Sequence, residues 1–442
     1  MSGTIYALAS GAGRAGVAVI RISGPEADDA LSLLTGKPLP AARRAQRVTL
    51  TKPGTGEALD DGLALRFPAP QSYTGEDVVE LHVHGGMGVI AAVLDALGGI
   101  RGLRLAEPGE FTRRAVLAGK MDLTAAEGLL DLIDADTDAQ RRQALRQSGG
   151  ALGRLYDGWR TRLIAALAHL EAAIDFPDEE LPENLVRAFR GDIAALAAEM
   201  ALHLDDGRRG ERLRQGFMVA IVGPPNAGKS SLLNLLARRD AAIVSARAGT
   251  TRDVVEAWLD LAGFPVLVAD TAGLREASDE IEAEGVRRAR QWAGTADLKI
   301  AVFDADESPA GGLDMVDADT LVVVNKVDLG KSRWKREFRG IGVFEMSLKS
   351  GEGVDAFLNA LSGVVRDRIG AATGAAPVLT RARHREAVIV CREALARSLA
   401  AALPDLAAED LRLAARALGR ITGAVDVEEL LDVIFRDFCI GK

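Results

Sequence analysis

The fold of this chain is decided by residues 216–235, which read GFMVAIVGPPNAGKSSLLNL. The apolar run from Met218 to Val222 predicts a buried strand, and an amphipathic helix is expected after the loop. The loop, Gly223 to Ser230, matches G-x-x-x-x-G-K-S/T in its required strand–loop–helix context. Its glycines let successive N–H groups point at phosphate oxygens, and the helix N-terminus adds positive potential. This context disfavours the alternative, a glycine-rich turn in an ordinary α/β unit.

Two further features predict a nucleotide with a bound metal ion. Lys229 should reach the β- and γ-phosphates, and the Ser230 hydroxyl should bind Mg²⁺. The stretch 266–273, VLVADTAG, predicts a second buried strand that ends in a carboxylate. Asp270 is then placed to support the Mg²⁺ shell, and the Gly273 N–H to sense the γ-phosphate.

The identity of the nucleotide base is indicated by Asn325-Lys-Val-Asp328, which follows a third apolar strand, Leu321 to Val324. The Asp328 carboxylate can accept from guanine N1–H and the exocyclic amine, a donor pair that adenine lacks. Ser347-Leu-Lys349 fits the loop behind the base, although Leu348 stands where a small residue is usual. Together these elements predict an α/β GTP-binding domain.

Composition limits the classes of protein. The 442 residues and 48% hydrophobic content suffice for two to four domains, each with its own core. A net charge of −9 provides no global basic field, so any RNA contact must use local patches. The two cysteines, Cys391 and Cys439, exclude a disulfide framework. Without a long apolar run or a basic leader, we expect a cytoplasmic protein with no membrane span.

Residues 1–118 have the pattern of an α+β domain. Strands are expected at Thr4–Ala9, Val17–Ile22, Arg47–Thr51, Gly62–Phe67 and Val78–Val83, and helices at Gly85–Leu97 and Glu110–Ala118. The stretch 11–16, GAGRAG, superficially resembles a dinucleotide-binding fingerprint. No long βαβ unit surrounds it, so we interpret it as a flexible turn.

Helical patterns lie on both sides of the GTP-binding domain. Residues 119–213 show two apolar stripes at three- and four-residue spacing, and helices are expected at about 380–402, 407–419 and 426–438. We therefore expect the GTPase domain, 214–374, to be inserted into one discontinuous helical domain made from 119–213 and 375–442.

Several motifs carry a family resemblance. They are SYTGED at 72–77, HGG at 84–86, PGEFTRRA at 108–115, GKMDL at 119–123, GTTRD at 249–253 and FCIGK at 438–442. With them the chain resembles the bacterial tRNA modification GTPases called MnmE or TrmE across nearly its full length. The resemblance implies a multidomain fold: an N-terminal folate-binding and dimerisation domain, a discontinuous helical domain and an inserted GTPase domain.

The resemblance also implies partners and a reaction. A homodimer would join an FAD-dependent partner, MnmG (GidA), in a heterotetramer that acts on tRNA. Using a tetrahydrofolate one-carbon unit, as the 5-formyl or 5,10-methylene form, it would add an aminomethyl or carboxymethylaminomethyl group to C5 of the wobble uridine. FAD would be bound only by the partner.

The GTP site follows from the motifs and the resemblance together. Its expected contacts are Gly223, Asn226, Ala227, Gly228, Lys229, Ser230, Ser231, Ser245, Ala246, Arg247, Ala248, Gly249, Thr250, Thr251, Asp270, Thr271, Ala272, Gly273, Asn325, Lys326, Asp328, Ser347, Leu348 and Lys349. The resemblance implies Mg²⁺ on Ser230 and Thr251, and K⁺ on Asn226, Ser245, Arg247 and Thr250. As an alternative, Asn226 is simply a residue that tolerates a turn.

The catalytic expectation starts from Leu274, which stands where Ras-like GTPases place the glutamine that orients water. The resemblance assigns that role to Glu282. The alternative is a solvated acidic loop.

A folate site is implied at Arg21, Glu80, Lys120 and Lys442. Arg and Lys suit the glutamate carboxylates of folate, and Glu80 can accept from the pterin edge. Otherwise each is a solvated surface charge. Cys439 is either an inert buried thiol at a helix end or a catalytic thiol near the one-carbon unit. Cys391 is expected in the core.

Two other functions share some of these motifs. A regulatory GTPase of ribosome or RNA assembly would use the same nucleotide motifs but leaves residues 1–118 and the terminal CIGK unexplained. A folate-dependent one-carbon transferase would leave the GTPase domain without a role.

Overall fold

The computed structural model describes residues 3–11, 13–175, 183–239, 255–270, 294–307, 316–330, 332–370, 377–425, 428–436 and 438–441. At 183–189, 239, 255, 428–430 and 433 it describes the backbone only. The chain forms two compact units. The first comprises Met1–Leu130, Gly153–Arg160 and Leu418–Lys442, and the second comprises Asp131–Leu152 and Thr161–Ala417.

A six-stranded sheet in the order β3-β4-β5-β2-β1-β6 organises the N-terminal part. Its strands are β1 (Thr4–Leu8), β2 (Ala15–Ser23), β3 (Gln46–Thr51), β4 (Ala58–Phe67), β5 (Val78–Gly85) and β6 (Leu103–Leu105). Paired strands are antiparallel, except that β1 and β6 are parallel. Helices α1 (Ala27–Thr35) and α2 (Met87–Gly98) bury one face of the sheet in a core around Ile20, Ile22 and Leu81. Alternation then places Arg21 and Glu80 on the opposite face.

The predicted GTPase domain contains a seven-stranded sheet in the order β12-β13-β11-β10-β7-β9-β8. Its strands are β7 (Phe217–Val222), β8 (Val255–Leu261), β9 (Phe264–Asp270), β10 (Leu298–Asp304), β11 (Thr320–Asn325), β12 (Glu337–Phe338) and β13 (Ile341–Glu345). The five central strands are parallel, and the two edge strands β8 and β12 are antiparallel to their neighbours.

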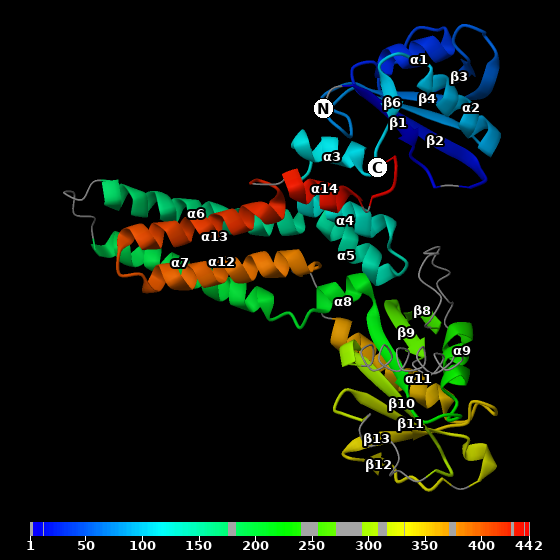
Figure 1. Ribbon diagram of the computed structural model, residues 1–442, viewed down its shortest axis with the longest axis vertical. Coiled ribbons are helices and arrows are strands. Elements are labelled where there is room, and N and C mark those ends of the chain that lie inside the picture. Colours follow the sequence, from blue (N-terminus) through cyan, green and yellow to red (C-terminus); the bar gives the residue numbers. More distant parts are fainter. Residues whose placement is uncertain are drawn as a thin grey trace, which may run out of the picture. The chain divides into compact units, whose positions relative to one another are not determined.

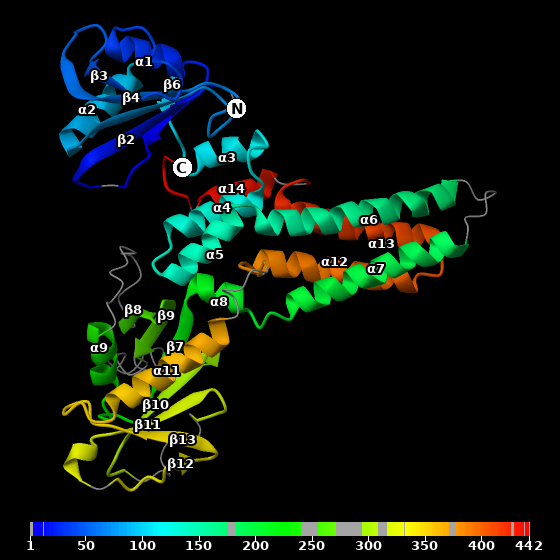
Figure 2. The ribbon, with the colours of Figure 1, turned by 180° about the vertical axis from the view of Figure 1, so that it is seen from behind.

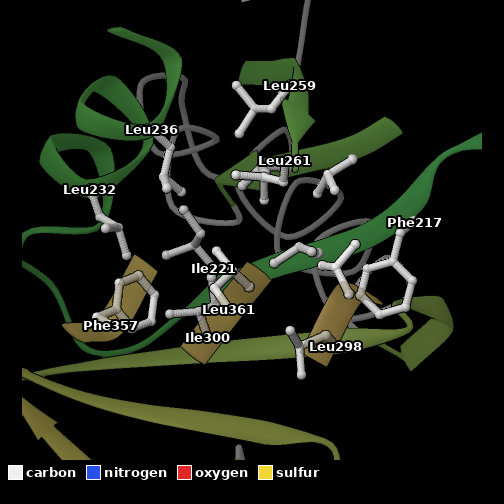
Figure 3. Packing of buried hydrophobic residues seen from close by; sticks show 14 of the residues in the cluster. Phe217, Ile221, Leu232, Leu236, Leu259, Leu261, Leu298, Ile300, Phe357 and Leu361 are labelled. Atoms are coloured by element: carbon white, nitrogen blue, oxygen red, sulfur yellow. The ribbon is translucent and has the colours of Figure 1, made fainter. Parts of the chain in front are cut away.

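Helices α9 (Lys229–Arg239) and α11 (Val354–Ile369) cover this sheet with apolar side chains. Figure 3 shows Leu232 and Leu236 of α9 and Phe357 and Leu361 of α11 packed around Ile221 of β7. These side chains are at most 2% exposed. The predicted strand Met218–Val222 is therefore the centre of a fully packed α/β core.

The remaining helices are α3 (Glu110–Leu117), α4 (Leu123–Ile133), α5 (Asp138–Ser148), α6 (Ala151–Asp175), α7 (Glu183–Leu204), α8 (Arg209–Gln215), α12 (Ala382–Ala400), α13 (Pro404–Thr422) and α14 (Glu428–Arg436). Helices α6, α7, α12 and α13 run side by side in Figures 1 and 2. Arg162 of α6 pairs with Glu199 of α7 at 2.8 Å, and Arg412 of α13 pairs with Glu171 of α6 at 2.9 Å. Segments before and after the GTPase part thus form one bundle, which confirms the predicted fold class.

Several local predictions needed correction. Helix α1 and strand β6 were not anticipated, and β2 and β4 begin earlier than expected, at Ala15 and Ala58. Helix α14 ends at Arg436, so Cys439 lies beyond the helix that the pattern extended to 438. Among the described helices, none is long and apolar enough to cross a membrane.

Candidate functional site

The phosphate-binding loop between β7 and α9 depends on two glycines. Gly223 has φ 143°, and a Cβ on it would lie 2.1 Å from the Val302 carbonyl oxygen. Gly228 has φ 106°, and a Cβ there would lie 2.3 Å from Nδ2 of Asn325. Side chains are excluded at both positions by backbone conformation and by space. With glycine at these two positions, the loop packs closer to β10 and β11 than it could with any other residue there.

The predicted phosphate and magnesium residues meet at this loop. Lys229 is 5% exposed, and its Nζ donates to the Pro224 carbonyl at 2.6 Å. The Ser230 hydroxyl donates to Asp270 Oδ2 at 2.6 Å. Asp270 is 1% exposed at the end of β9, where Ile221 of β7 is its neighbour across the strands. A hydroxyl and a carboxylate held together at a phosphate loop are suitable oxygen donors for Mg²⁺.

Asn325 connects the phosphate loop to the loop behind the base. It is 4% exposed; its Nδ2 donates to the Ala227 carbonyl at 2.9 Å, and its Oδ1 accepts from the Leu348 N–H at 3.1 Å. Leu348, the residue that departed from the usual pattern, packs against the GTPase core. A Cβ on Gly228 would lie 3.4 Å from its Cδ1. Leu348 thus fills space beside the phosphate loop.

The predicted guanine-reading carboxylate, Asp328, is exposed. Ser347 is fully buried, and its hydroxyl donates to Asp328 Oδ1 at 2.6 Å. This bond holds one carboxylate oxygen, so the direction of the carboxylate is set before guanine arrives.

Lys326, the residue after Asn325, adopts φ 68° and pairs with Asp304 at 2.7 Å. Partial burial alone would raise the pKa of Asp304, but the Lys326 ammonium and the N–H groups of Asp306 and Ala305 hold that pKa below its ordinary value of 3.8. The sequence reading did not anticipate this ion pair. The only signal for it was the position of Asp304 at the end of the strand next to Lys326.

Several predicted GTP-site and folate-site residues lie outside the described part of the chain. They are Ser245, Ala246, Arg247, Ala248, Gly249, Thr250, Thr251, Thr271, Ala272, Gly273, Leu274, Glu282 and Lys442. The exposed Asn226, with φ 62°, is the predicted K⁺ ligand that the structure does describe. Within the described ranges, no three His, Cys, Asp or Glu side chains gather as ligands for a metal ion.

A second site is centred on an ion pair in the N-terminal sheet. Arg21 of β2 and Glu80 of β5 face each other across the strands, and the arginine Nε and Nη2 donate to Glu80 Oε1 at 3.0 and 2.9 Å. The Arg21 guanidinium lies 5.0 Å from the Tyr73 ring centroid and 5.7 Å from that of Phe111. Burial raises the pKa of the Tyr73 phenol above its ordinary value. Tyr73 and Phe111 belong to motifs that carry the family resemblance. The sequence did not indicate that their rings would make cation–π contacts with Arg21.

The C-terminal motif reaches this ion pair. Ile440 forms an antiparallel bridge with Pro108, and the Gly109 N–H donates to the Cys439 carbonyl at 3.3 Å. Gly441 has φ 104°, and a Cβ on it would lie 2.0 Å from the Leu8 carbonyl oxygen. Its own carbonyl accepts from Arg21 Nη1 at 3.4 Å. The tail is thus docked on the N-terminal domain beside Arg21.

The other residues tied to this site have distinct surroundings. Lys120 donates to the Pro70 carbonyl, and His82 Nε2 lies 3.6 Å from Glu80 Oε2. His84 is exposed and pairs with Asp60. The Cys439 thiol is exposed, so the alternative of a buried thiol at a helix end is wrong. Cys391 is buried as predicted, and burial raises its thiol pKa to about 12.

Two family models match the chain. The model described as the MnmE helical domain matches residues 123–439, and that described as the GTP-binding protein TrmE N-terminus matches residues 4–120. Together they span both sites described above.

Curated relatives match along the whole length. A protein named tRNA modification GTPase MnmE from Paramagnetospirillum magneticum is 60% identical over 445 residues and covers 100% of both chains. One of the same name from Parvibaculum lavamentivorans is 60% identical, covering 99% of this chain and 100% of its own. A human protein named 5-taurinomethyluridine-[tRNA] synthase subunit GTPB3, mitochondrial, is 49% identical over 99% of this chain and 93% of its own.

Proposed function

This chain belongs to the family of tRNA modification GTPases named MnmE, and we propose that it modifies C5 of the wobble uridine of certain tRNAs. It is a GTPase that converts GTP to GDP and phosphate. In our proposal an FAD-dependent partner, MnmG (GidA), joins it, and a tetrahydrofolate one-carbon unit becomes part of an aminomethyl or carboxymethylaminomethyl group.

The observation that carries the folate proposal is the docking of the C-terminal tail at Arg21. Glu80 Oε1 accepts both of the hydrogen bonds that Arg21 makes to Glu80. Oε2, which lies 3.6 Å from His82 Nε2, is the oxygen we assign to the amino-pyrimidine edge of the pterin. Lys120 and Lys442 are assigned to the glutamate carboxylates of the folate, as point charges. The Cys439 carbonyl is held by Gly109, so its exposed thiol stays on the same domain as the Arg21–Glu80 pair.

For GTP hydrolysis, Ser230 and Asp270 support the metal proposal because their oxygens already lie 2.6 Å apart. We assign Ser230 and Thr251 to Mg²⁺, which neutralises charge on the phosphates when bound. Asn226 presents a neutral amide on the exposed rim of the loop, and with Ser245, Arg247 and Thr250 it is assigned to K⁺. A cation there takes the place of an arginine finger.

Glu282 is assigned to orienting the attacking water, since Leu274 cannot. In the proposed homodimer, two GTPase domains facing each other would bring residues 245–251 and Glu282 to the nucleotide together, so dimerisation and hydrolysis become linked. Hydrolysis is then expected to rise strongly in KCl over NaCl at matched ionic strength. Equal rates in the two salts would contradict the K⁺ assignment.

The folate proposal is tested by titrating 5-formyltetrahydrofolate into the full-length protein. Arg21→Ala should weaken binding at least tenfold, because a charged hydrogen bond contributes about 1.5–3 kcal/mol. Arg66→Ala is the matched control. Like Arg21, Arg66 lies in a strand of this sheet, β4, and forms an ion pair, with Asp28. Strand alternation places it on the opposite face of the sheet. No binding by the intact protein, or equal loss in both variants, would contradict the site.

The reaction itself is tested by nucleoside analysis of tRNA from a deletion strain. Loss of the C5 modification, and its return with the wild-type gene, is the expected result. Unchanged wobble uridines would favour a regulatory GTPase of RNA assembly.

A further inference from the structure

Three stretches of at least 25 residues in this acidic chain contain no acidic residue: 1–25, 30–56 and 212–239. Residues 30–56 hold Lys37, Arg43, Arg44, Arg47 and Lys52 and no Asp or Glu, although the whole chain has a net charge of −9. This stretch covers the end of α1, the loop that follows it and strand β3. Strand β3 is an edge strand of the N-terminal sheet. A local excess of positive charge therefore lies at one edge of the N-terminal sheet.

Three of these cations lie within five residues of the chain, and we name them the β3-edge arginines: Arg43, Arg44 and Arg47. All three are exposed, and the Arg47 side chain is 81% exposed. Within the described residues, no carboxylate lies within ion-pairing distance of Arg43 or Arg44, and Arg47 has only Asp61 at 3.8 Å. Asp61 also accepts from the Thr49 hydroxyl at 2.6 Å. The group therefore keeps most of its positive charge for an external partner.

The backbone under these arginines is held in place. Arg43 has φ 58°, its N–H donates to the Arg66 carbonyl at 2.8 Å, and its guanidinium donates to the Gln71 carbonyl. The Arg44 N–H closes a turn to the Ala41 carbonyl at 3.2 Å. Arg47 is the second residue of β3 and pairs with Leu63 of β4. Guanidinium groups on an anchored backbone lose less entropy when they bind.

Strand register places Arg47 on the same face as the Arg21–Glu80 pair. Arg47 lies opposite Leu63, and Leu63 lies opposite His82 of β5. Glu80 is two residues from His82, so its side chain emerges on the same face, and it is paired with Arg21. Two strand spacings, about 10 Å, separate β3 from β5. Arg47 therefore emerges on the face that carries the proposed folate site, and Arg43 and Arg44 lie in the loop directly before its strand.

We propose that the β3-edge arginines bind the phosphate backbone of the substrate tRNA. Planar guanidinium groups match phosphate oxygens in pairs, and unpaired cations release the counterions of RNA on binding. Because the net charge is −9, long-range attraction cannot hold RNA, so binding needs a local group such as this one. The proposal rests on tRNA being the substrate. It adds where the chain holds the tRNA backbone while a base approaches the Arg21–Glu80 face.

A rival basic segment lies in the GTPase domain and supplies a matched control. Arg333, Lys335 and Arg336 are also exposed, but Arg333 pairs with Asp306 at 3.1 Å and Glu337 follows directly in the chain. Trp334 anchors that segment by packing 4.6 Å from the Phe303 ring. Its positive charge is therefore partly compensated, and it belongs to a different sheet.

The test is binding of fluorescein-labelled tRNA to the full-length protein, by anisotropy, between 50 and 200 mM KCl. Arg43→Gln/Arg44→Gln/Arg47→Gln should reduce the slope of log affinity against log salt by about 2 to 3, because each phosphate contact contributes about 0.7 to 0.9. Replacing the same three residues by Lys should restore most of the slope. The control Arg333→Gln/Lys335→Gln/Arg336→Gln removes the same charge and should leave the slope unchanged. GTP hydrolysis without tRNA should be unchanged in all variants.

Each other outcome overturns the proposal in a recognisable way. If the β3-edge variant binds tRNA with the wild-type affinity and salt slope, the β3-edge arginines do not contact tRNA. The proposal that tRNA is the substrate is then unaffected. A larger loss in the GTPase-domain control assigns the contact to the rival segment. Binding of the patch to polyglutamate with no preference for tRNA indicates an acidic protein partner instead. Failure of the wild-type protein to bind tRNA at all overturns the proposed function as well.

Discussion

Replacing Asn325 by Ala should uncouple the phosphate loop from the loop behind the base. The buried amide makes two hydrogen bonds, to the Ala227 carbonyl and from the Leu348 N–H. Truncation leaves both backbone groups without this partner. A buried polar group left unpaired costs about 1–3 kcal/mol, so we expect a total of about 2–6 kcal/mol for the two groups.

This cost should appear mainly in GTP affinity, because nucleotide binding requires both loops to be in place. At 1.4 kcal/mol per tenfold change, it corresponds to a loss of about 30-fold to 20,000-fold. Calorimetric titration of GTP and GDP measures the affinity, and a thermal melt of the same samples measures any share taken by folding. Asn325→Asp separates the two bonds, since a carboxylate still accepts from Leu348 but is repelled by the Ala227 carbonyl.

The matched control is Ser350→Ala, which lies in the same loop, three residues from Ser347 and away from the two bonds. It should change GTP affinity less than threefold. The reasoning is refuted if Asn325→Ala binds GTP within threefold of wild type and melts at the same temperature. It is also refuted if Asn325→Asp is indistinguishable from wild type, because the donor to Ala227 would then contribute nothing.

Three further predictions follow from the GTPase domain. Gly228→Ala should lower GTP affinity by at least tenfold in the same titration, because φ 106° and the 2.3 Å approach to an amide nitrogen exclude a Cβ; Gly363→Ala, where a Cβ meets nothing within 4 Å, should bind normally. Asp328→Asn should shift the nucleotide preference from GTP to xanthosine triphosphate, measured by competition binding, and unchanged GTP selectivity would contradict the guanine assignment. Asp304→Asn should destabilise the protein above about pH 4, where the depressed pKa of Asp304 makes its pairing with Lys326 stabilising, and this difference should shrink as the pH falls through that pKa; a pH-independent difference in urea midpoint would contradict it.

Local sequence patterns predicted the GTPase fold and which strand ends carry several of the predicted site residues. Apolar runs followed by glycines, hydroxyls and carboxylates placed Ser230 and Asp270 at the same edge of the sheet, because parallel strands end on one side. The pairing at 2.6 Å agrees with that prediction. The two-sided helical pattern likewise predicted one bundle around an insertion, since an apolar stripe needs a partner helix.

Tertiary structure alone decided how distant segments meet. Nothing in the periodicity of residues 438–441 shows that the tail forms a bridge to Pro108 and places the Gly441 carbonyl at Arg21, because such contacts depend on chain paths hundreds of residues apart. The same holds for Tyr73 and Phe111 beside Arg21. The sequence by itself determined which chemical groups the chain carries and which strands and helices hold them. Which of those groups share a site was decided by packing and strand register, since these fix distances that no local pattern encodes.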